Sequence, residues 1–234
     1  MTTHPGEPAA VYRRRVESHG LGGSHHHILA EIPPGARVLD LGCASGYLAA
    51  AMAALGCTVV GFERDPAEAE LARRHCEEVI VGDVEAEDER AAIPGGFDVV
   101  VMGDVLEHLA DPWAVLRFVR GRLAPGGFAL VSVPNVAAWP VRLGLLRGRF
   151  EYADLGILDR THLRFFTRET AHELARSSGF AVERERLAHL ERPPGPVRRA
   201  LPLPANLVDR ALVRLLPGLF AQQFVLRLRP VGQP

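Results

Sequence analysis

The 234-residue chain contains no lysine, and all 27 of its basic residues are arginine. Without lysine, the chain can form no Schiff base through an amine side chain and has no P-loop lysine to hold a phosphate. Acidic residues number 28, which gives a formal net charge of -1. Because there is no overall positive field to attract a phosphate backbone, we expect no nucleic-acid partner.

Cysteine is scarce and long apolar runs are absent. The three cysteines, Cys43, Cys57 and Cys76, are not at metal-ligand spacing, and reduced thiols in a cytoplasm fit them best. No run of about 18 apolar residues occurs, and the polar segment 1–15 lacks the apolar stretch of a secretion signal. We therefore expect a cytoplasmic protein with no membrane span. Its 47% apolar and 24% charged residues suit one main globular domain.

Segments with the patterns of strands and helices alternate along the chain. Short apolar runs predict strands, and apolar residues at helical spacing predict the helices between them. The expected strands are 36–42, 57–62, 79–81, 97–102, 128–134, 180–187 and 223–229, and the expected helices are 46–55, 66–76, 113–123 and 170–178. This alternation indicates an α/β fold with a mostly parallel sheet and right-handed crossovers.

A glycine loop, residues 40–46, joins the first expected strand to the first expected helix. Its backbone N–H groups converge at a helix N-terminus, which suits a carboxylate or a phosphate. Counted from Gly42, the dinucleotide fingerprint G-x-G-x-x-G has Ala44 and Tyr47 in place of its other glycines. The loop instead resembles the first motif of class I S-adenosylmethionine (SAM) dependent methyltransferases: an acid, any residue, Gly, three residues and Gly. A plain tight turn is the alternative.

Four further segments resemble motifs of the same family, in the same order. Glu63 ends the second strand 63 − 40 = 23 residues after Asp40, near the separation of about 20 expected for an acid that binds ribose hydroxyls. After the third strand, the resemblance implies that Asp83 binds the adenine amino group and that the next backbone N–H contacts the ring. After the fourth strand, Asp104 would form a wall near the methyl group, and the Pro125–Gly127 segment resembles the next motif.

The resemblance assigns one set of residues to the cofactor, SAM. These residues are Asp40, Gly42, Cys43, Ala44, Gly46, Glu63, Arg64, Asp83, Val84, Gly103 and Asp104. It also implies a Rossmann-like, doubly wound, mostly parallel sheet of seven strands with an antiparallel last strand. We expect residues 1–35 to form a helical segment over the cofactor site, 36–136 the core, and 137–234 the acceptor-side insertions and final strands.

Two segments interrupt the regular alternation, residues 137–166 and 191–220, and such insertions usually shape the substrate side of an α/β scaffold. The second contains an apolar stripe at helical spacing, made of Leu207, Val208, Ala211, Leu212, Leu215 and Leu216. The stripe could pack on its own domain, act as a lid, form a homodimer face, or allow peripheral membrane contact through 197–220.

The methyl group of SAM is intrinsically reactive, so the enzyme mainly has to align an acceptor, and no metal is required. A base is needed only if a hydroxyl must lose its proton. The candidates are His162 and His108, although each could instead fix a loop through hydrogen bonds. Adjacent histidines at 25–27 cannot all face one ion from a single helix, so we expect no metal there. Residues 148–152 and 159–166 also resemble a subgroup of ubiquinone-biosynthesis-like methyltransferases.

The sequence therefore predicts methyl transfer from SAM to a small-molecule acceptor, with a hydroxyl of a sugar or secondary metabolite favoured over nitrogen or carbon. Two alternatives remain at this point. One is a non-catalytic SAM-binding or structural partner protein. The other is an NAD-dependent oxidoreductase, which Ala44 and Tyr47 in the glycine loop disfavour.

Overall fold

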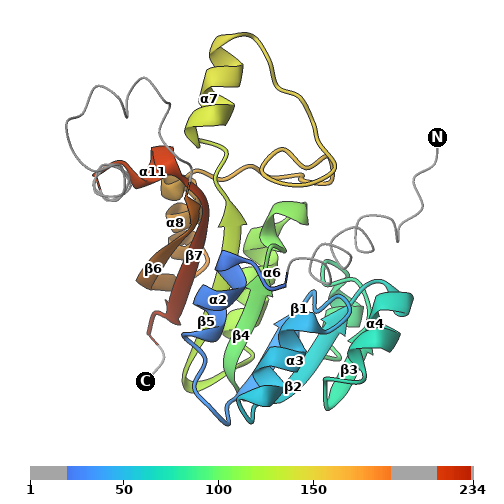
Figure 1. Cartoon of the computed structure of the whole chain (residues 1–234). Coiled ribbons are helices and arrows are strands. Elements are labelled where there is room, and N and C mark those ends of the chain that lie inside the picture. Colours follow the sequence, from blue (N-terminus) through green and yellow to red (C-terminus); the bar gives the residue numbers. More distant parts are fainter. Residues whose placement is uncertain (1–19, 191–214, 233–234) are drawn as a thin grey trace.

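The computed structural model describes residues 20–190 and 215–232, and its centre is a seven-stranded sheet in the order β3-β2-β1-β4-β5-β7-β6 (Figure 1). The parallel strands are β1 (Arg37–Leu41), β2 (Thr58–Glu63), β3 (Glu78–Val81), β4 (Phe97–Gly103) and β5 (Leu123–Pro134). The last strand, β7 (Ala221–Pro230), runs antiparallel to both β5 and β6 (Phe180–Leu190). The expected doubly wound sheet with an antiparallel last strand is confirmed.

Alternate side chains of the central strands enter two apolar cores, one on each face of the sheet. On one face, Val38 and Val99 pack with α2 (Gly23–Leu29) and α3 (Tyr47–Ala54). On the other face, Leu39 and Val100 belong to the core shared with α6 (Pro112–Arg120) and α8 (Arg168–Ser177). Because both faces are covered, these strands read as continuous apolar runs in the sequence.

Local signals in the sequence set the beginnings of several helices. Asp65 caps α4 (Pro66–Ala72) by accepting a hydrogen bond from the backbone N–H of Ala67, and Asp111 caps α6 by accepting one from that of Ala114. Proline follows each of the two caps. Thr167 and Thr170 form a reciprocal capping box at α8. Two of these helices are shorter than expected, since α4 ends at Ala72 and α6 at Arg120.

The Pro125–Gly127 segment lies inside β5, not before it as the sequence analysis expects. Leu123 pairs with Phe97 and Phe128 pairs with Val99, so residues 124–127 bulge out of the ladder. Gly126 has a φ of 76°. A Cβ on Gly127 would lie 2.8 Å from the carbonyl oxygen of Phe97. The positive φ therefore explains Gly126, and close backbone approach explains Gly127, whereas the sequence suggests that both glycines form a break between helix and strand.

The remaining helical segments are short and lie at the strand ends or in the insertions. They are α5 (Glu87–Arg90), the 3-10 turn η1 (Leu106–His108), α7 (Trp139–Leu146) and α11 (Pro217–Phe220). Figure 1 shows α7 projecting beyond the ends of the strands, and Leu146 on it is 85% exposed. Of the expected apolar stripe, only Leu215 and Leu216 belong to the described residues, and both are exposed. No helix among the described residues is long and apolar enough to cross a membrane.

Candidate functional site

A cavity of about 850 Å³ opens at the carboxyl ends of the parallel strands. It is lined by the segments that follow β1, β2, β3 and β4, by residues of 156–163 in the insertion, and by Gly20–His25. In the strand order β3-β2-β1-β4-β5, the direction of winding reverses between β1 and β4, and this is where open α/β sheets bind their ligands. The volume is in the range of small-molecule sites.

The glycine loop after β1 forms one wall of this cavity. Gly42 and Gly46 each have a φ of 78°. A Cβ on Gly42 would lie 2.8 Å from Cγ2 of Val105, and one on Gly46 would lie 2.9 Å from Cα of Ala72. Both positions therefore require glycine for backbone conformation and for space. Ala44, where many family members have a glycine, adopts a φ of 46°.

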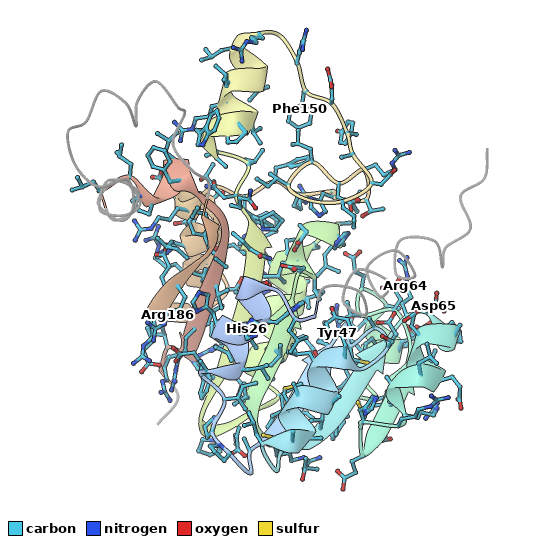
Figure 2. All side chains as sticks on the ribbon, viewed as in Figure 1. His26, Tyr47, Arg64, Asp65, Phe150 and Arg186 are labelled. Carbon is cyan, nitrogen blue, oxygen red and sulfur yellow. The ribbon has the colours of Figure 1, made fainter. Side chains whose placement is uncertain are left out.

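Glu63, at the end of β2, is bound to this loop. Its Oε2 accepts a hydrogen bond from the N–H of Ala44 at 2.9 Å, and its Oε1 accepts one from the N–H of Asp65 at 2.9 Å. Each carboxylate oxygen has two lone pairs, so each keeps one acceptor site toward the cavity that Glu63 lines. In Figure 2, Tyr47, Arg64 and Asp65 lie together at this edge of the sheet.

The segment after β3 forms the next part of the wall. Asp83 is half-buried, and its Oδ1 accepts a hydrogen bond from the N–H of Glu85 at 2.9 Å. Its own N–H donates to Oε2 of Glu89 at 2.6 Å, which fixes the turn. Nη1 of Arg64 lies 3.8 Å from Oδ2 of Asp83, so a weak ion pair also joins the segments that follow β2 and β3. Val84 lines the cavity beside them.

Asp104, at the end of β4, has a φ of 58°, which is uncommon for a residue with a side chain. Its N–H donates to Oγ of Ser132 at 3.0 Å, and the same hydroxyl donates to Oδ1 of Asp104 at 2.7 Å. Gln223 of β7 also donates its side-chain amide to this oxygen. Residues of two strands, β5 and β7, therefore hold Asp104 at the cavity wall.

Three residues of the glycine loop that the sequence assigns to the cofactor do not line the cavity. Asp40 is 3% exposed, and its Oδ2 has no hydrogen-bond partner among the described residues. Burial, followed by the charge of Glu63, raises the pKa of Asp40 to about 7. Cys43 is buried against β2, and Gly46 packs on α4. The other eight assigned residues line the cavity.

The two histidines that the sequence singles out as candidate bases lie together on the acceptor side, with ring centroids 4.8 Å apart. Nδ1 of His162 lies 3.1 Å from the carbonyl oxygen of Ile157, and Nδ1 of His108 lies 3.3 Å from that of Thr161. Since a carbonyl only accepts, we assign the proton of each neutral ring to Nδ1, which leaves each Nε2 as an acceptor. Desolvation lowers the pKa of both rings, and the neighbouring His162 lowers that of His108 further.

Glu107 lies beside this pair, and the sequence analysis does not single it out. It is 1% exposed, and within the part of the chain that the structure describes neither of its side-chain oxygens has a hydrogen-bond partner. Burial, followed by the charge of Asp104, raises its pKa well above the usual value. The oxygen or nitrogen atoms of Glu107, His108 and His162 that could bind a metal lie within 4.8 Å of one another. Among the described residues, this is the group that could hold a cation. An acid between Leu106 and His108, after an apolar run, is the signal that could have indicated it.

Residues 20–25 cover the cavity next to the glycine loop. His25 is 5% exposed and its ring centroid lies 5.3 Å from that of Tyr47, whereas His26 is exposed. Shortly after α2, the carboxylate of Glu31 accepts hydrogen bonds from Arg184, Arg186 and Arg227 at 3.1–3.3 Å, which joins the end of this helix to β6 and β7. The rest of the expected N-terminal cover, residues 1–19, lies outside the described residues.

Comparison with known families explains this arrangement of loop, acids and cavity. The family described as "Methyltransferase domain" matches residues 12–185, which is most of the chain. The chain belongs to this family. Membership confirms the class of protein that the motifs indicate and its cofactor, SAM.

Ubiquinone biosynthesis O-methyltransferases are among the relatives of the chain. That of Thiobacillus denitrificans is 34% identical over 153 residues, which are 64% of this chain and 66% of the relative. That of Xanthomonas campestris pv. campestris is 42% identical over 106 residues, or 44% of each chain. The matched region therefore spans less than two thirds of the length of these relatives.

Solved structures share the fold of this methyltransferase-family chain. A TehB-like SAM-dependent methyltransferase from Corynebacterium glutamicum aligns with a TM-score of 0.61 at 18% identity, covering 97% of this chain and 100% of the other. A SAM-dependent methyltransferase from Archaeoglobus fulgidus aligns with a TM-score of 0.62 at 16% identity, covering 93% and 98%. At these identities the likeness concerns the fold alone.

Proposed function

We propose that the chain transfers a methyl group from SAM to an oxygen atom of a small-molecule acceptor. The observation that carries the proposal is that two groups of residues, one suited to a cofactor and one to an acceptor, line the same cavity. The glycine loop, Glu63 and Asp83 line one part of it, and His108 and His162 line another. A cofactor and an acceptor could therefore meet within a single enclosed space, as transfer between them requires.

The residues of the first wall fit the cofactor. Gly42 lets Val105 pack directly against the backbone of the loop, and the free acceptor sites of the Glu63 carboxylate suit the two hydroxyls of a ribose. The Asp83 carboxylate suits an adenine amino group, and Val84 beside it suits the ring. When bound, SAM supplies a methyl group on a positively charged sulfur. These residues would bind and orient it, and Asp104 would form the wall toward the acceptor.

On the acceptor side, we propose that His162 accepts the proton of the acceptor hydroxyl at Nε2. The hydrogen bond from its Nδ1 to the carbonyl of Ile157 favours the tautomer with a free lone pair on Nε2, and its lowered pKa keeps the ring neutral near pH 7. His108 is the second candidate. Its ring is held by Thr161, whose hydroxyl donates in turn to Oδ1 of Asp159 at 2.7 Å.

We further propose an acceptor that joins a phenolic hydroxyl to an apolar part, rather than a sugar. Support comes from the names of the relatives and from a row of aromatic rings that leaves the cavity wall. From His162 the row passes to Phe165, Phe150 and Tyr152, with centroid distances of 6.3, 5.5 and 5.5 Å. Tyr152, at the outer end of the row, is 57% exposed, and Figure 2 shows Phe150 beside α7, in the loop that follows this helix. An apolar acceptor could lie along these rings with its hydroxyl at the histidines.

Calorimetric titration with S-adenosylhomocysteine tests the cofactor half of the proposal. We expect binding near micromolar, weakened at least tenfold (about 1.4 kcal/mol) in Glu63→Ala and unchanged in Glu78→Ala, an exposed acid on β3. NAD serves as the control ligand. Binding of NAD without binding of S-adenosylhomocysteine would contradict the proposal and favour an oxidoreductase.

The acceptor half is tested by mass spectrometry of candidate acceptors incubated with SAM and the wild-type chain. We expect a methyl group on phenols with apolar substituents and none on free sugars. Methylation of sugars alone would overturn the acceptor class but not the activity. Cofactor binding without methylation of any acceptor would favour the non-catalytic alternative.

A further inference from the structure

Two cysteine thiols from different parts of the chain meet above Gly61, in the middle of β2. Cys43 lies in the glycine loop after β1, and Cys76 follows α4. A Cβ on Gly61 would lie 2.8 Å from Sγ of Cys43 and 3.2 Å from Sγ of Cys76. Both sulfur atoms therefore occupy the space that a side chain at residue 61 would fill, and the absence of that side chain brings them together.

The two thiols differ in the way that a reactive pair requires. Cys43 is 2% exposed, whereas Cys76 is half-buried and so can be reached from solvent. The neighbouring Cys43 thiol lowers the pKa of Cys76, although burial opposes this effect. Since the thiolate is the nucleophile, Cys76 is the thiol that reacts first, and Cys43 is the neighbour that can resolve the product.

Cys43 is also tied to the cofactor wall through the backbone on both sides. The N–H groups of Gly42 and Cys43 both donate to the carbonyl oxygen of Phe62, at 2.7 and 3.2 Å, and the next N–H, that of Ala44, donates to Glu63. An S–S bond of about 2.05 Å is much shorter than a contact between two thiols, and it fixes the dihedral angle about that bond. Formation of the bond would therefore move the loop that carries these hydrogen bonds.

We propose that Cys43 and Cys76 are a redox modification site, at which an oxidant of the hydroperoxide class forms a disulfide that weakens cofactor binding. The Cys76 thiolate attacks the O–O bond, which gives a sulfenic acid and releases an alcohol, or water when the oxidant is hydrogen peroxide. The Cys43 thiol then forms the S–S bond and displaces a second molecule of water. Two thiols are oxidised, and one peroxide bond is reduced. Only the effect on cofactor binding rests on the proposed function.

Disulfide formation is tested on the full chain, treated with hydrogen peroxide and examined by intact mass and by peptide mapping without reductant. We expect the loss of two hydrogen masses and a peptide pair joining Cys43 to Cys76, both reversed by dithiothreitol. The matched control is Cys57→Ser, because Cys57 is buried in another core with its Sγ 3.5 Å from the carbonyl of Pro33. This variant should form the same bond, and Cys76→Ser should not. A bond that involves Cys57, or oxidation of Cys76 without a bond, would overturn the proposal.

The functional effect is tested by titrating the reduced and oxidised forms with S-adenosylhomocysteine. We expect affinity to fall at least tenfold on oxidation and to return with dithiothreitol, while Cys76→Ser binds equally well before and after peroxide. If the disulfide forms and affinity does not change, the regulatory effect is wrong. If the reduced wild type does not bind, the proposed function fails, but the mapped disulfide still decides whether the thiols are a modification site.

Discussion

The carboxylate of Glu63 accepts a hydrogen bond from the backbone N–H of Ala44 at 2.9 Å, so the acid that ends β2 also holds the turn that follows β1. Its other oxygen accepts from the N–H of Asp65. Both oxygens face donors within the protein before any ligand is considered. We therefore expect Glu63 to have two effects that two measurements can separate, one on the stability of the loop and one on cofactor binding.

Glu63→Gln is expected to weaken both the loop and the cofactor site. The amide has one oxygen, so either Ala44 or Asp65 would present its N–H to an NH₂ group. Hydrogen bonds to charged groups contribute about 1.5–3 kcal/mol each, so we expect a loss of about 1–2 kcal/mol in the free energy of unfolding. Urea denaturation measures this loss, and titration with S-adenosylhomocysteine should show at least tenfold weaker binding. Wild-type values in both experiments would contradict the double role.

Gly42→Ala is expected to damage the cofactor site in a way that a second substitution partly repairs. The new Cβ would lie 2.8 Å from Cγ2 of Val105, a side-chain atom that can be removed. The double variant Gly42→Ala/Val105→Ala should therefore recover part of the S-adenosylhomocysteine affinity lost in the single variant. Recovery should be incomplete because the φ of 78° still strains alanine. Equal affinity in the single and double variants would show that the clash is unimportant.

Gly46→Ala provides the comparison, because its new Cβ would meet Cα of Ala72, a backbone atom that no substitution can remove. We expect this variant to lose more stability in urea than Gly42→Ala. Greater loss in Gly42→Ala would contradict the packing argument.

The sequence predicts most of the first wall and the two histidines of the second, but not the contacts from distant segments that hold these residues in place. Glu63 and Asp83 directly follow apolar strands, and parallel strands bring their carboxyl ends to one edge, so local pattern suffices to place them. Gln223 is different, because it reaches Asp104 from 119 residues away on an antiparallel strand. No local signal marks such a contact. The same reason hides the environment of Glu107, whose carbonyl accepts hydrogen bonds from Leu163 and Arg164 in the insertion.

Asp40 is expected to make the stability of the chain fall as pH rises toward neutrality. Its pKa is raised from 3.8 to about 7, so between these values the folded state binds a proton that the unfolded state does not. Stability is thus greatest at low pH and is lost as pH rises through the folded pKa. Relative to Asp40→Asn, the wild type should lose about 2 kcal/mol between about pH 5.5 and about pH 8.5. Urea denaturation of both proteins at the two pH values measures this difference, and a constant difference would contradict the raised pKa.

His162→Gln is expected to lower turnover while leaving the binding of S-adenosylhomocysteine unchanged, because the ring lies on the acceptor side of the cavity. A general base contributes about 100-fold or more to the rate, so we expect a loss of at least that size with a phenolic acceptor. Since desolvation lowers the pKa of His162 below 6.5, its Nε2 is free to accept a proton from slightly acidic pH upward. The wild-type profile of kcat/KM against pH should therefore fall only below about pH 6.5, and this acidic limb should disappear in the variant.

His75→Gln, at an exposed position after α4, is the control and should keep both the wild-type rate and the acidic limb. If His162→Gln keeps the acidic limb of the pH profile, the base is instead His108, whose pKa is lowered in the same direction.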